Sequence, residues 1–445
     1  MRRRHSESRF RARRRTRTEA RIADAPSSGG PPDTGPTSSS GLTPHTGGTQ
    51  GTTPDARRPT VLDMARLAVL VAGLLCVVTG VLPWREAVAD VGRVGPLLVF
   101  LVAVIVFAEL VKEADVFDVL AARIAIVARG RYWALFALCV AFAAVITMLL
   151  NLDTTAVLLT PVLLVLAART GIPALPLAMT TIWLANTASL LLPVSNLTNL
   201  LAEARLGLST HGFAARMWAP QVAALAVTAL LLWIFFWRRG ARGAQDRYRP
   251  PSPVSVRDRV LFRTGTVVCV LFAVAVLAGA PIAEVAVASA VVLVAAFAWR
   301  DRSRLTFSLV PWQLAAFVIG LFLVVPALSR YGLDEVTRAL AGDGGYRTAA
   351  AGAGLANVVN NLPAYYAGER VVPPGGRDAL LTLLIGVNVG SVITPWASVA
   401  TLLWFETCRR HGVRVPPSKF VITGACLAVT AVTAAVAALI LTAGP

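Results

Sequence analysis

The chain has 445 residues, of which 56% are hydrophobic and only 15% are charged. An average soluble domain carries about 25% charged residues, so this composition excludes an ordinary soluble protein. The formal net charge of +18 is almost all arginine, and these arginines cluster in tails and loops, which fits the orientation of a membrane protein rather than nucleic-acid binding.

Residues 1–60 differ in composition from the rest of the chain. Arginine is frequent in residues 1–22, and Pro, Gly, Ser and Thr dominate residues 23–60. Nothing there can bury a core, so we predict a disordered cytoplasmic tail. The five cysteines of the chain are scattered singly, without the spacing of a metal site, so the sequence predicts neither a metal nor a cofactor.

Apolar segments long enough to cross a bilayer recur along the remaining chain. A hydrocarbon core of about 30 Å needs about 20 apolar residues, and only helices satisfy their backbone groups in lipid. We predict spans at 62–82, 94–112, 176–201, 217–237, 262–280, 282–299, 310–329, 377–404 and 419–442. With residues 1–60 inside, these crossings place every arginine-rich loop on the cytoplasmic side.

A carboxylate interrupts the apolar segment 132–168. Asp153 lies at its centre, and the arm that follows, 156–168, would extend only about 20 Å at 1.5 Å per residue. Both flanks of the segment are basic, so both ends should lie inside. We therefore predict a re-entrant helical hairpin whose tip, 151–155, stops near the bilayer midplane.

A second polar tip interrupts the segment 349–369, where Asn360 and Asn361 precede Leu362 and Pro363. Its flanks lie outside by the same count of crossings. This hairpin should therefore enter the membrane from the opposite face.

Each hairpin is followed by a span that contains a proline. Pro193 lies within 176–201, and Pro395 lies within 377–404. Proline inside a helix removes a backbone hydrogen bond and kinks or breaks the helix. We expect two broken helices, with polar residues at each break.

The chain therefore divides into two similar units, 61–237 and 282–445. Residues 238–281 supply a basic cytoplasmic loop and one connecting span, which reverses the second unit. The predicted fold is an all-α polytopic membrane protein with inverted repeats, two re-entrant hairpins and two broken helices. This arrangement is typical of secondary transporters that bind their substrate near the midplane.

Asp153 is the first candidate for proton or cation coupling, because a carboxylate desolvated at that depth can exchange protons near neutral pH. The alternative is a structural acid paired with an arginine or a helix N-terminus. Other candidate ligands offer amides and hydroxyls, which also cap helices or join them. They are Asn151, Thr154, Thr155, Asn186, Ser195, Asn196, Thr198, Asn360, Asn361, Asn388, Thr394, Ser398 and Thr401.

Three further acids stand near the ends of predicted segments. Glu109 lies beside Lys112, so we expect snorkelling or an ion pair, with a proton path as the alternative. Glu284 and Glu369 are expected near the outer surface, as interface residues.

Three stretches, 151–161, 356–363 and 386–404, resemble the ion-transporter superfamily of arsenite-efflux permeases, sodium/proton antiporters and divalent-anion/sodium symporters. The resemblance is closest to the arsenical-pump membrane protein group and covers about 62–442. Leu152 separates Asn151 from Asp153, whereas arsenite permeases usually place Asn and Asp side by side. Neither tip has the Ser-Asn-Thr of the anion symporters, which disfavours a dicarboxylate substrate. The resemblance implies an elevator-type carrier, with a dimerising scaffold and a moving domain that holds both hairpins, and hence a homodimer.

The sequence thus predicts a multi-pass transporter of the cell membrane that exports a small inorganic solute, first of all arsenite or antimonite, in exchange for protons. The alternative is a sodium/proton antiporter, or an organic- or divalent-anion carrier, on the same scaffold. No GxxxxGK[ST] loop occurs, so a separate ATPase subunit would have to supply any ATP-driven step. Neither HExxH nor GxSxG occurs, which disfavours an enzyme, and a receptor role would leave the polar tips unexplained.

Overall fold

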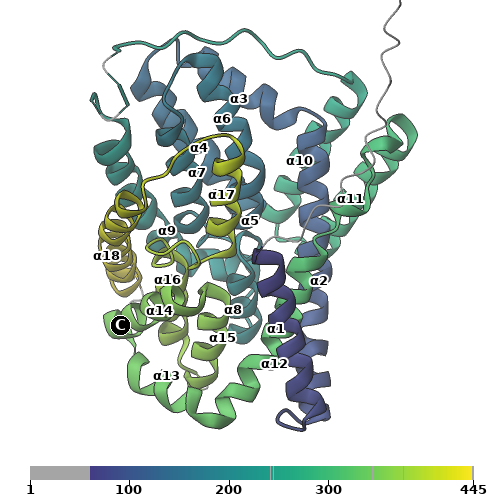
Figure 1. Ribbon diagram of the computed structural model, residues 1–445, viewed down its shortest axis with the longest axis vertical. Helices are drawn as coiled ribbons and strands as arrows, with labels where there is room; N and C mark the ends of the chain where they lie inside the picture. Colours follow the sequence, from purple (N-terminus) through teal and green to yellow (C-terminus); the bar gives the residue numbers. More distant parts are fainter. Residues whose placement is uncertain (1–60, 241, 244, 343, 374, 443–445) are drawn as a thin grey trace, which may run out of the picture. The chain divides into compact units, whose positions relative to one another are not determined.

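The computed structural model describes residues 61–442 except 241, 244, 343 and 374. The predicted disordered tail, 1–60, lies outside the described residues. Regular structure in the described part is helical (Figure 1), as the sequence predicts. The α-helices are α1 Val61–Val78, α2 Trp84–Glu113, α3 Val116–Val127, α4 Tyr132–Leu149, α5 Leu152–Thr154, α6 Thr160–Thr170, α7 Ala174–Thr187, α8 Leu197–Leu206, α9 Thr210–Leu232, α10 Arg259–Leu277, α11 Ile282–Arg300, α12 Trp312–Leu328, α13 Asp334–Ala341, α14 Gly345–Val359, α15 Asn361–Val371, α16 Arg377–Val389, α17 Val399–Arg410 and α18 Pro417–Thr442.

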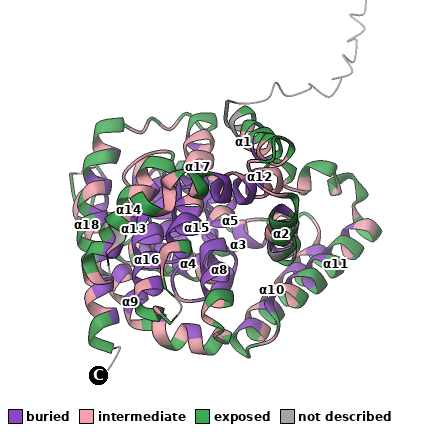
Figure 2. Ribbon diagram, turned by 90° about the horizontal axis from the view of Figure 1, so that it is seen from below, coloured by how far each residue is buried: buried purple, intermediate pink, exposed green. Residues whose placement is uncertain are grey.

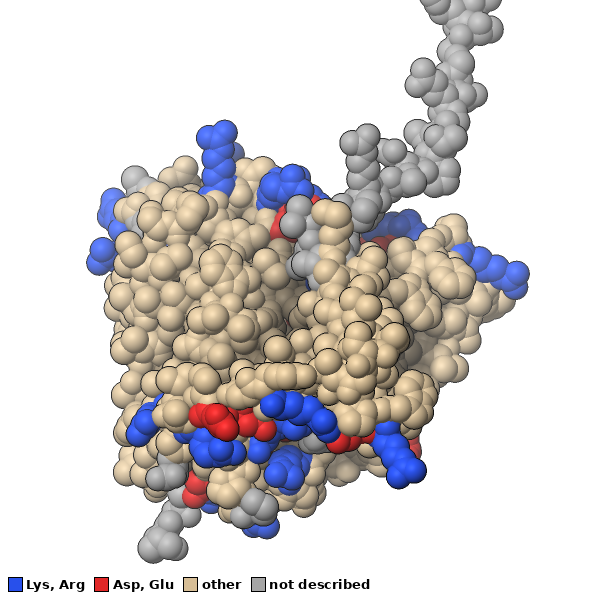
Figure 3. Space-filling model, turned by 60° about the horizontal axis from the view of Figure 1, so that its bottom comes forward, with Lys and Arg blue, Asp and Glu red and all other residues tan. Residues whose placement is uncertain are grey.

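Helices occupy all the predicted spans, and the two expected breaks are present. The span 176–201 is divided into α7 and α8, and 377–404 is divided into α16 and α17. Among the described residues, eight helices are long and apolar enough to cross a membrane by themselves. Figure 3 shows charged side chains gathered toward the ends of the visible face, with a band of other residues between them. These features describe a multi-pass membrane protein.

The first hairpin is present, but the predicted length of its second arm is wrong. The chain turns after α4 at 150–151, and a continuous helix follows over Leu152–Thr170, which has 19 residues. At 1.5 Å per residue that is about 28 Å, so length alone does not prevent a crossing. The sequence analysis ended the arm at the polar residues, whereas the helix continues through them. The re-entrant depth of this hairpin therefore stays a prediction.

The same arm contains a π-helical turn, Thr155–Leu159, which ends two residues before Pro161. Proline cannot donate to the carbonyl four residues earlier, so the local hydrogen-bond pattern must change. π-Helical turns of this kind occur often at functional sites. Here the turn lies within two residues of Asp153.

The second hairpin consists of α14 and α15, which meet at Asn360. Figure 1 shows α4 and α6 in the upper part of the molecule and α14 and α15 in the lower part. The two hairpins thus approach the middle of the molecule from opposite ends. The helix α13 lies between α12 and this hairpin, in a segment for which no helix was predicted.

The membrane helices pack in two groups, which lie side by side in Figure 2. The scaffold group consists of α1, α2, α10, α11 and α12. The hairpin group consists of α4–α9 and α14–α18, and therefore contains both hairpins and both broken helices. Helix α3 contacts members of both groups.

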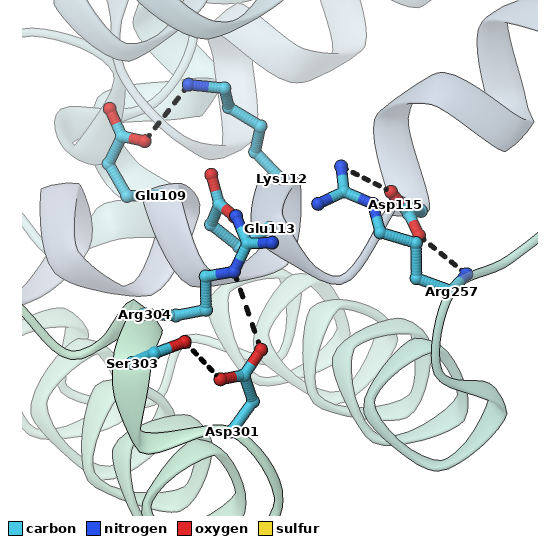
Figure 4. Close-up of polar contacts among 8 residues, drawn as sticks. All are labelled: Glu109, Lys112, Glu113, Asp115, Arg257, Asp301, Ser303 and Arg304. Atoms are coloured by element: carbon cyan, nitrogen blue, oxygen red, sulfur yellow. Dashed lines mark hydrogen bonds and ion pairs between the residues drawn. The ribbon is translucent and has the colours of Figure 1, made fainter. Parts of the chain in front are cut away.

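Ion pairs join the ends of the scaffold helices that carry basic loops (Figure 4). Arg257 lies 3.1 Å from Asp115, directly after α2, and Arg304 lies 2.8 Å from Glu113 at the end of α2. Asp115 is buried, whereas Arg257, Glu113 and Arg304 are partly exposed, and an ion pair with an exposed partner contributes little by itself. Together they connect the ends of α2, α10 and α11.

Two glycines hold α1 against α12. A Cβ atom on Gly320 would lie 2.5 Å from the Cα atom of Leu70, and one on Gly73 would lie 2.8 Å from the carbonyl oxygen of Gly320. Small residues allow helix backbones to approach closely in membranes. This contact fixes the position of α1 in the scaffold group.

We predict that Gly320→Ala lowers the midpoint of thermal unfolding in detergent, because the added methyl group must push α1 away from α12. Overpacking of this kind costs about 1–3 kcal/mol. Gly354→Ala is the matched control, because a Cβ atom there meets nothing within 4 Å. Equal midpoints for both variants would show that the close approach of α1 and α12 is wrong.

Candidate substrate and ion site

Four helices of the hairpin group begin around one small cavity. They are α5 and α15 at the two hairpin tips, and α8 and α17 after the two breaks. The cavity has a volume of about 30 Å³, enough for one water-sized molecule. The first residues of all four helices line it: Leu152, Asp153, Leu197, Asn361, Leu362 and Val399. The scaffold group closes the cavity with Leu101 of α2 and with Leu314, Phe317 and Val318 of α12.

A polar side chain caps each of these four helices, which confirms the capping role considered for the hairpin-tip residues Asn151 and Asn360. A capped N-terminus still carries backbone N–H groups and the positive end of the helix dipole. Four such ends therefore favour oxygen atoms of a ligand near this cavity. The cap acceptors and their backbone donors are Asn151 Oδ1 with Asp153 N (2.8 Å), Asn196 Oδ1 with Thr198 N (3.2 Å), Asn360 Oδ1 with Leu362 N (3.4 Å) and Ser398 Oγ with Thr401 N (3.1 Å).

Three polar atoms near these helix starts are buried without a hydrogen-bond partner among the described residues. They are the amide nitrogens of Asn151 and Asn196 and the hydroxyl of Thr154. A buried donor that stays unpaired costs about 1–3 kcal/mol. Such atoms are rare in folded proteins and are often explained by a ligand, an ion or water. They supply hydrogen-bond donors at the tip of the first hairpin and at the first break.

Asp153 also lines a second, larger cavity of about 210 Å³, which reaches the segment 308–311 before α12. Thr154 lines it as well, together with Arg66 of α1 and Glu109 of α2. Arg66 is only 6% exposed and interacts electrostatically with Asp153. The sequence analysis missed Arg66, although a charge inside an apolar span is itself a signal of function.

The expected ion pair of Glu109 is confirmed, because the Nζ atom of Lys112 lies 3.2 Å from its carboxylate (Figure 4). The surface position predicted for Glu369 is wrong, because this residue is only 2% exposed. Helix α13, which was not predicted, packs against α14 and α15 and helps to cover this hairpin.

The two breaks are joined by direct hydrogen bonds. Asn388 accepts a bond from the hydroxyl of Thr198 at 2.8 Å and donates one to Asn199 at 2.8 Å. Ser391 donates to the side chain of Asn186 at 3.3 Å. These side chains are buried, so their bonds fix the two broken helices against each other. The hydrogen bonds between the broken helices therefore occupy the side chains of Asn186, Thr198 and Asn388. None of the three lines either cavity.

Asn357 organises the second break, which sequence analysis did not anticipate. Its side-chain oxygen accepts bonds from the backbone of Ile393 (3.2 Å) and Thr394 (3.0 Å). Its amide donates to the carbonyl of Gly390 at 2.8 Å, and its own carbonyl accepts from the indole of Trp396 at 2.8 Å. The sequence signal that could have identified Asn357 is its place in 356–363, one of the three stretches that carry the family resemblance. Asn357 satisfies the backbone groups that the break frees.

Asn360 fixes the tip of the second hairpin. Its φ angle of 95° is unusual for a residue with a side chain, although Asn tolerates positive φ better than most. Its amide donates to the carbonyl of Trp396 at 2.9 Å, and the backbone N–H of Asn361 donates to Ala397 at 2.8 Å. The tip is therefore tied to the second break.

The remaining candidates lie close to the cavities without lining them. Thr155 donates to the carbonyl of Asn151 at 2.9 Å, and Ser195 donates to the carbonyl of Ser189 at 2.9 Å. The hydroxyl of Thr394 donates to the carbonyl of Asn357, and that of Thr401 lies 2.8 Å from Ser398. Of the predicted site residues, Asp153, Thr154 and Asn361 line the cavities. Asn151 and Asn196 carry unpaired amides at two of the helix starts, and the others position the chain around the site.

Comparisons with known proteins agree with this arrangement. Residues 60–372 match the family described as citrate transporter. The arsenical pump membrane protein of Escherichia coli is 30% identical over 76% of this chain and 85% of its own length. The protein of the same name from Yersinia enterocolitica is also 30% identical, with the same coverage.

The crystal structure of the YdaH transporter from Alcanivorax borkumensis is similar in fold, with a TM-score of 0.52 and 16% identity. The match covers 86% of this chain and 97% of that one. Taken with the sequence relatives, this places the hairpins and broken helices in a transporter fold. The chain therefore belongs to the citrate transporter family, and its similar relatives include the arsenical pump membrane proteins.

Proposed function

We propose that this protein is a secondary transporter of the cell membrane that exports arsenite or antimonite in exchange for protons. The observation that carries the proposal is the position of the Asp153 carboxylate. It lines both the small cavity at the four capped helix starts and the larger cavity of about 210 Å³, which has room for such a solute. Arsenous acid is uncharged near neutral pH and presents several hydroxyl groups. Each hydroxyl can accept a hydrogen bond from a helix start and donate one to a carboxylate. The names of the relatives support the same solute.

The charges around the cavities favour a neutral solute over citrate. Among the described residues that line them, Arg66 is the one cation, against the carboxylates of Asp153 and Glu109. A tricarboxylate would need more positive charge than this, because buried charges must be paired. The family description alone therefore does not lead us to citrate.

We further propose that residues 61–237 and 282–445 are inverted repeats. Helix α1 packs on α12 as α11 packs on α2, and the pair α4 and α7 has its counterpart in α14 and α16. In this proposal the hairpin group carries the solute past the scaffold group, with the N-terminus in the cytoplasm. A homodimer through the scaffold is a proposal that rests on the resemblance. A separate ATPase subunit is a proposal for any ATP-driven step, because the sequence has no GxxxxGK[ST] loop.

Proton exchange at Asp153 completes the cycle. A proton from the outer side neutralises the carboxylate, the hairpin group moves, and the proton leaves on the inner side. The solute then takes its place at the same carboxylate for the return. One group that binds either the proton or the solute couples their opposite movements, provided that the empty, ionised carrier does not cross.

A sodium/proton antiporter is the second candidate. The smaller cavity, of about 30 Å³, has room for a single ion, and Asp153 and Asn361 offer the oxygen ligands that hard cations prefer. If sodium were the transported ion and occupied the smaller cavity, the larger cavity would have no direct role in binding.

We predict that Asp153→Asn abolishes coupled transport. In everted vesicles that contain the whole chain, an acid interior should drive arsenite accumulation, and the variant should lose it by about tenfold or more because no proton can be exchanged. Asp378→Asn is the control, because Asp378 is an exposed carboxylate paired with Arg216. Accumulation that follows a sodium gradient instead would favour the second candidate, and unchanged accumulation by Asp153→Asn would exclude this site.

We also predict separate effects of two substitutions at Asn196. Asn196→Ser keeps a cap acceptor but removes the unpaired amide, so KM for arsenite should rise about 3- to 10-fold, the value of one neutral hydrogen bond. The thermal midpoint should stay close to that of the wild type. Asn196→Ala removes the cap as well and should lower the midpoint. An unchanged KM in Asn196→Ser would mean that Asn196 serves only as a cap.

A further inference from the structure

Arg66 is a buried charge in an apolar scaffold helix, and the transport scheme above gives it no role. Its side chain lines the larger cavity opposite the tip of the first hairpin. A charge placed in a membrane helix is costly, and such residues usually face a pathway or a partner. Its position therefore needs an explanation beyond the packing of α1.

The attraction between Arg66 and Asp153 connects the two groups of helices. Arg66 belongs to α1, which packs closely on α12 through Gly73 and Gly320. Asp153 belongs to α5, which packs on α4, α7 and α17 of the hairpin group. The cation is thus on the scaffold side and the carboxylate on the hairpin side.

Among the described residues that line the two cavities, Glu109 carries the one further charge beside this pair. Helix α2 contributes Glu109, whose carboxylate is paired with Lys112 (Figure 4). The described residues that α12 and α17 place on the two cavities, among them Gln313 and Leu403, carry no charge. The ionisation of Asp153 therefore changes how strongly Arg66 attracts the hairpin group.

We propose that Arg66 is the coupling residue of the carrier: it holds the hairpin group against the scaffold while Asp153 is ionised and unloaded. A proton on Asp153 removes one of the two charges, and a bound solute occupies the carboxylate, so either one releases the hairpin group. The empty, ionised carrier stays in place. This restriction makes the exchange obligatory, since an empty carrier that moved freely would dissipate the proton gradient. The inference rests on the proposed antiport and assigns its control to a residue that does not bind the solute.

The test compares three activities of the whole chain in everted vesicles, with arsenite as the probe. Arg66→Gln should keep arsenite–arsenite exchange, which needs only loaded carriers. It should lose pH-driven accumulation by about tenfold or more and should increase net downhill efflux without a pH gradient. Arg66→Lys keeps the charge and should retain most of the accumulation. Arg263→Gln, at an exposed position of scaffold helix α10, should behave as the wild type.

Several results would overturn the inference. Full pH-driven accumulation by Arg66→Gln would show that the charge is not needed for coupling. Loss of exchange in a folded Arg66→Gln protein would place Arg66 in solute binding instead. If Arg66→Gln does not fold, Arg66→Lys tests the inference instead. A folded Arg66→Lys protein that does not accumulate arsenite would show that a positive charge at this position is not sufficient for coupling, which contradicts the inference. A wild-type chain that moves no arsenite would refute the proposed function itself, so the two failures can be told apart.

Discussion

Backbone N–H groups at the start of a helix need partners, and in an apolar interior water cannot supply them. This constraint governs the centre of the molecule, where α5, α8, α15 and α17 all begin around one cavity. An Asn or Ser cap satisfies part of each helix start, and the remaining donors point to a ligand with oxygen atoms. Each hairpin tip or helix break creates such donors. The hairpins and broken helices form a binding site only where these donors surround the same cavity. The bonds of Asn388 and Asn360 hold them together.

The charge distribution assigns different tasks to the two groups of helices. The hairpin group contributes Asp153 and the uncharged donors, which can bind either a proton or a small hydroxylated solute. The scaffold group contributes Arg66 and most of the apolar wall. Movement of one group past the other must change the environment of Asp153. In this account, the electrostatic attraction between Arg66 and ionised Asp153 controls when the hairpin group moves past the scaffold group.

Much of the fold could be predicted because it depends on local patterns. Apolar runs located the spans, Pro193 and Pro395 located the breaks, and polar clusters located the hairpin tips. Helix bounds were less certain, because a polar residue such as Asp153 can continue a helix when the tertiary structure surrounds it. The second arm of the first hairpin was therefore predicted as 156–168, shorter than the helix Leu152–Thr170, and α13 was not predicted.

The site could be predicted only in part because its contacts join distant parts of the chain. Asp153, Thr154 and Asn361 were found as polar residues in apolar surroundings. The roles of Asn357 and Asn388 depend on backbone groups freed elsewhere, which a single sequence does not reveal. Arg66 lies inside the predicted span 62–82 but was not singled out, and its burial depends on how α1 packs in the folded chain.

Direct observation of the bound solute is the clearest test of the central claim. Crystals of the whole chain soaked with antimonite should give an anomalous peak for antimony beside Asp153, the residue that lines both cavities. The peak should be absent from crystals of Asp153→Asn. A peak confined to the cysteines, such as Cys139 or Cys408, or an equal peak in both proteins, would contradict the account.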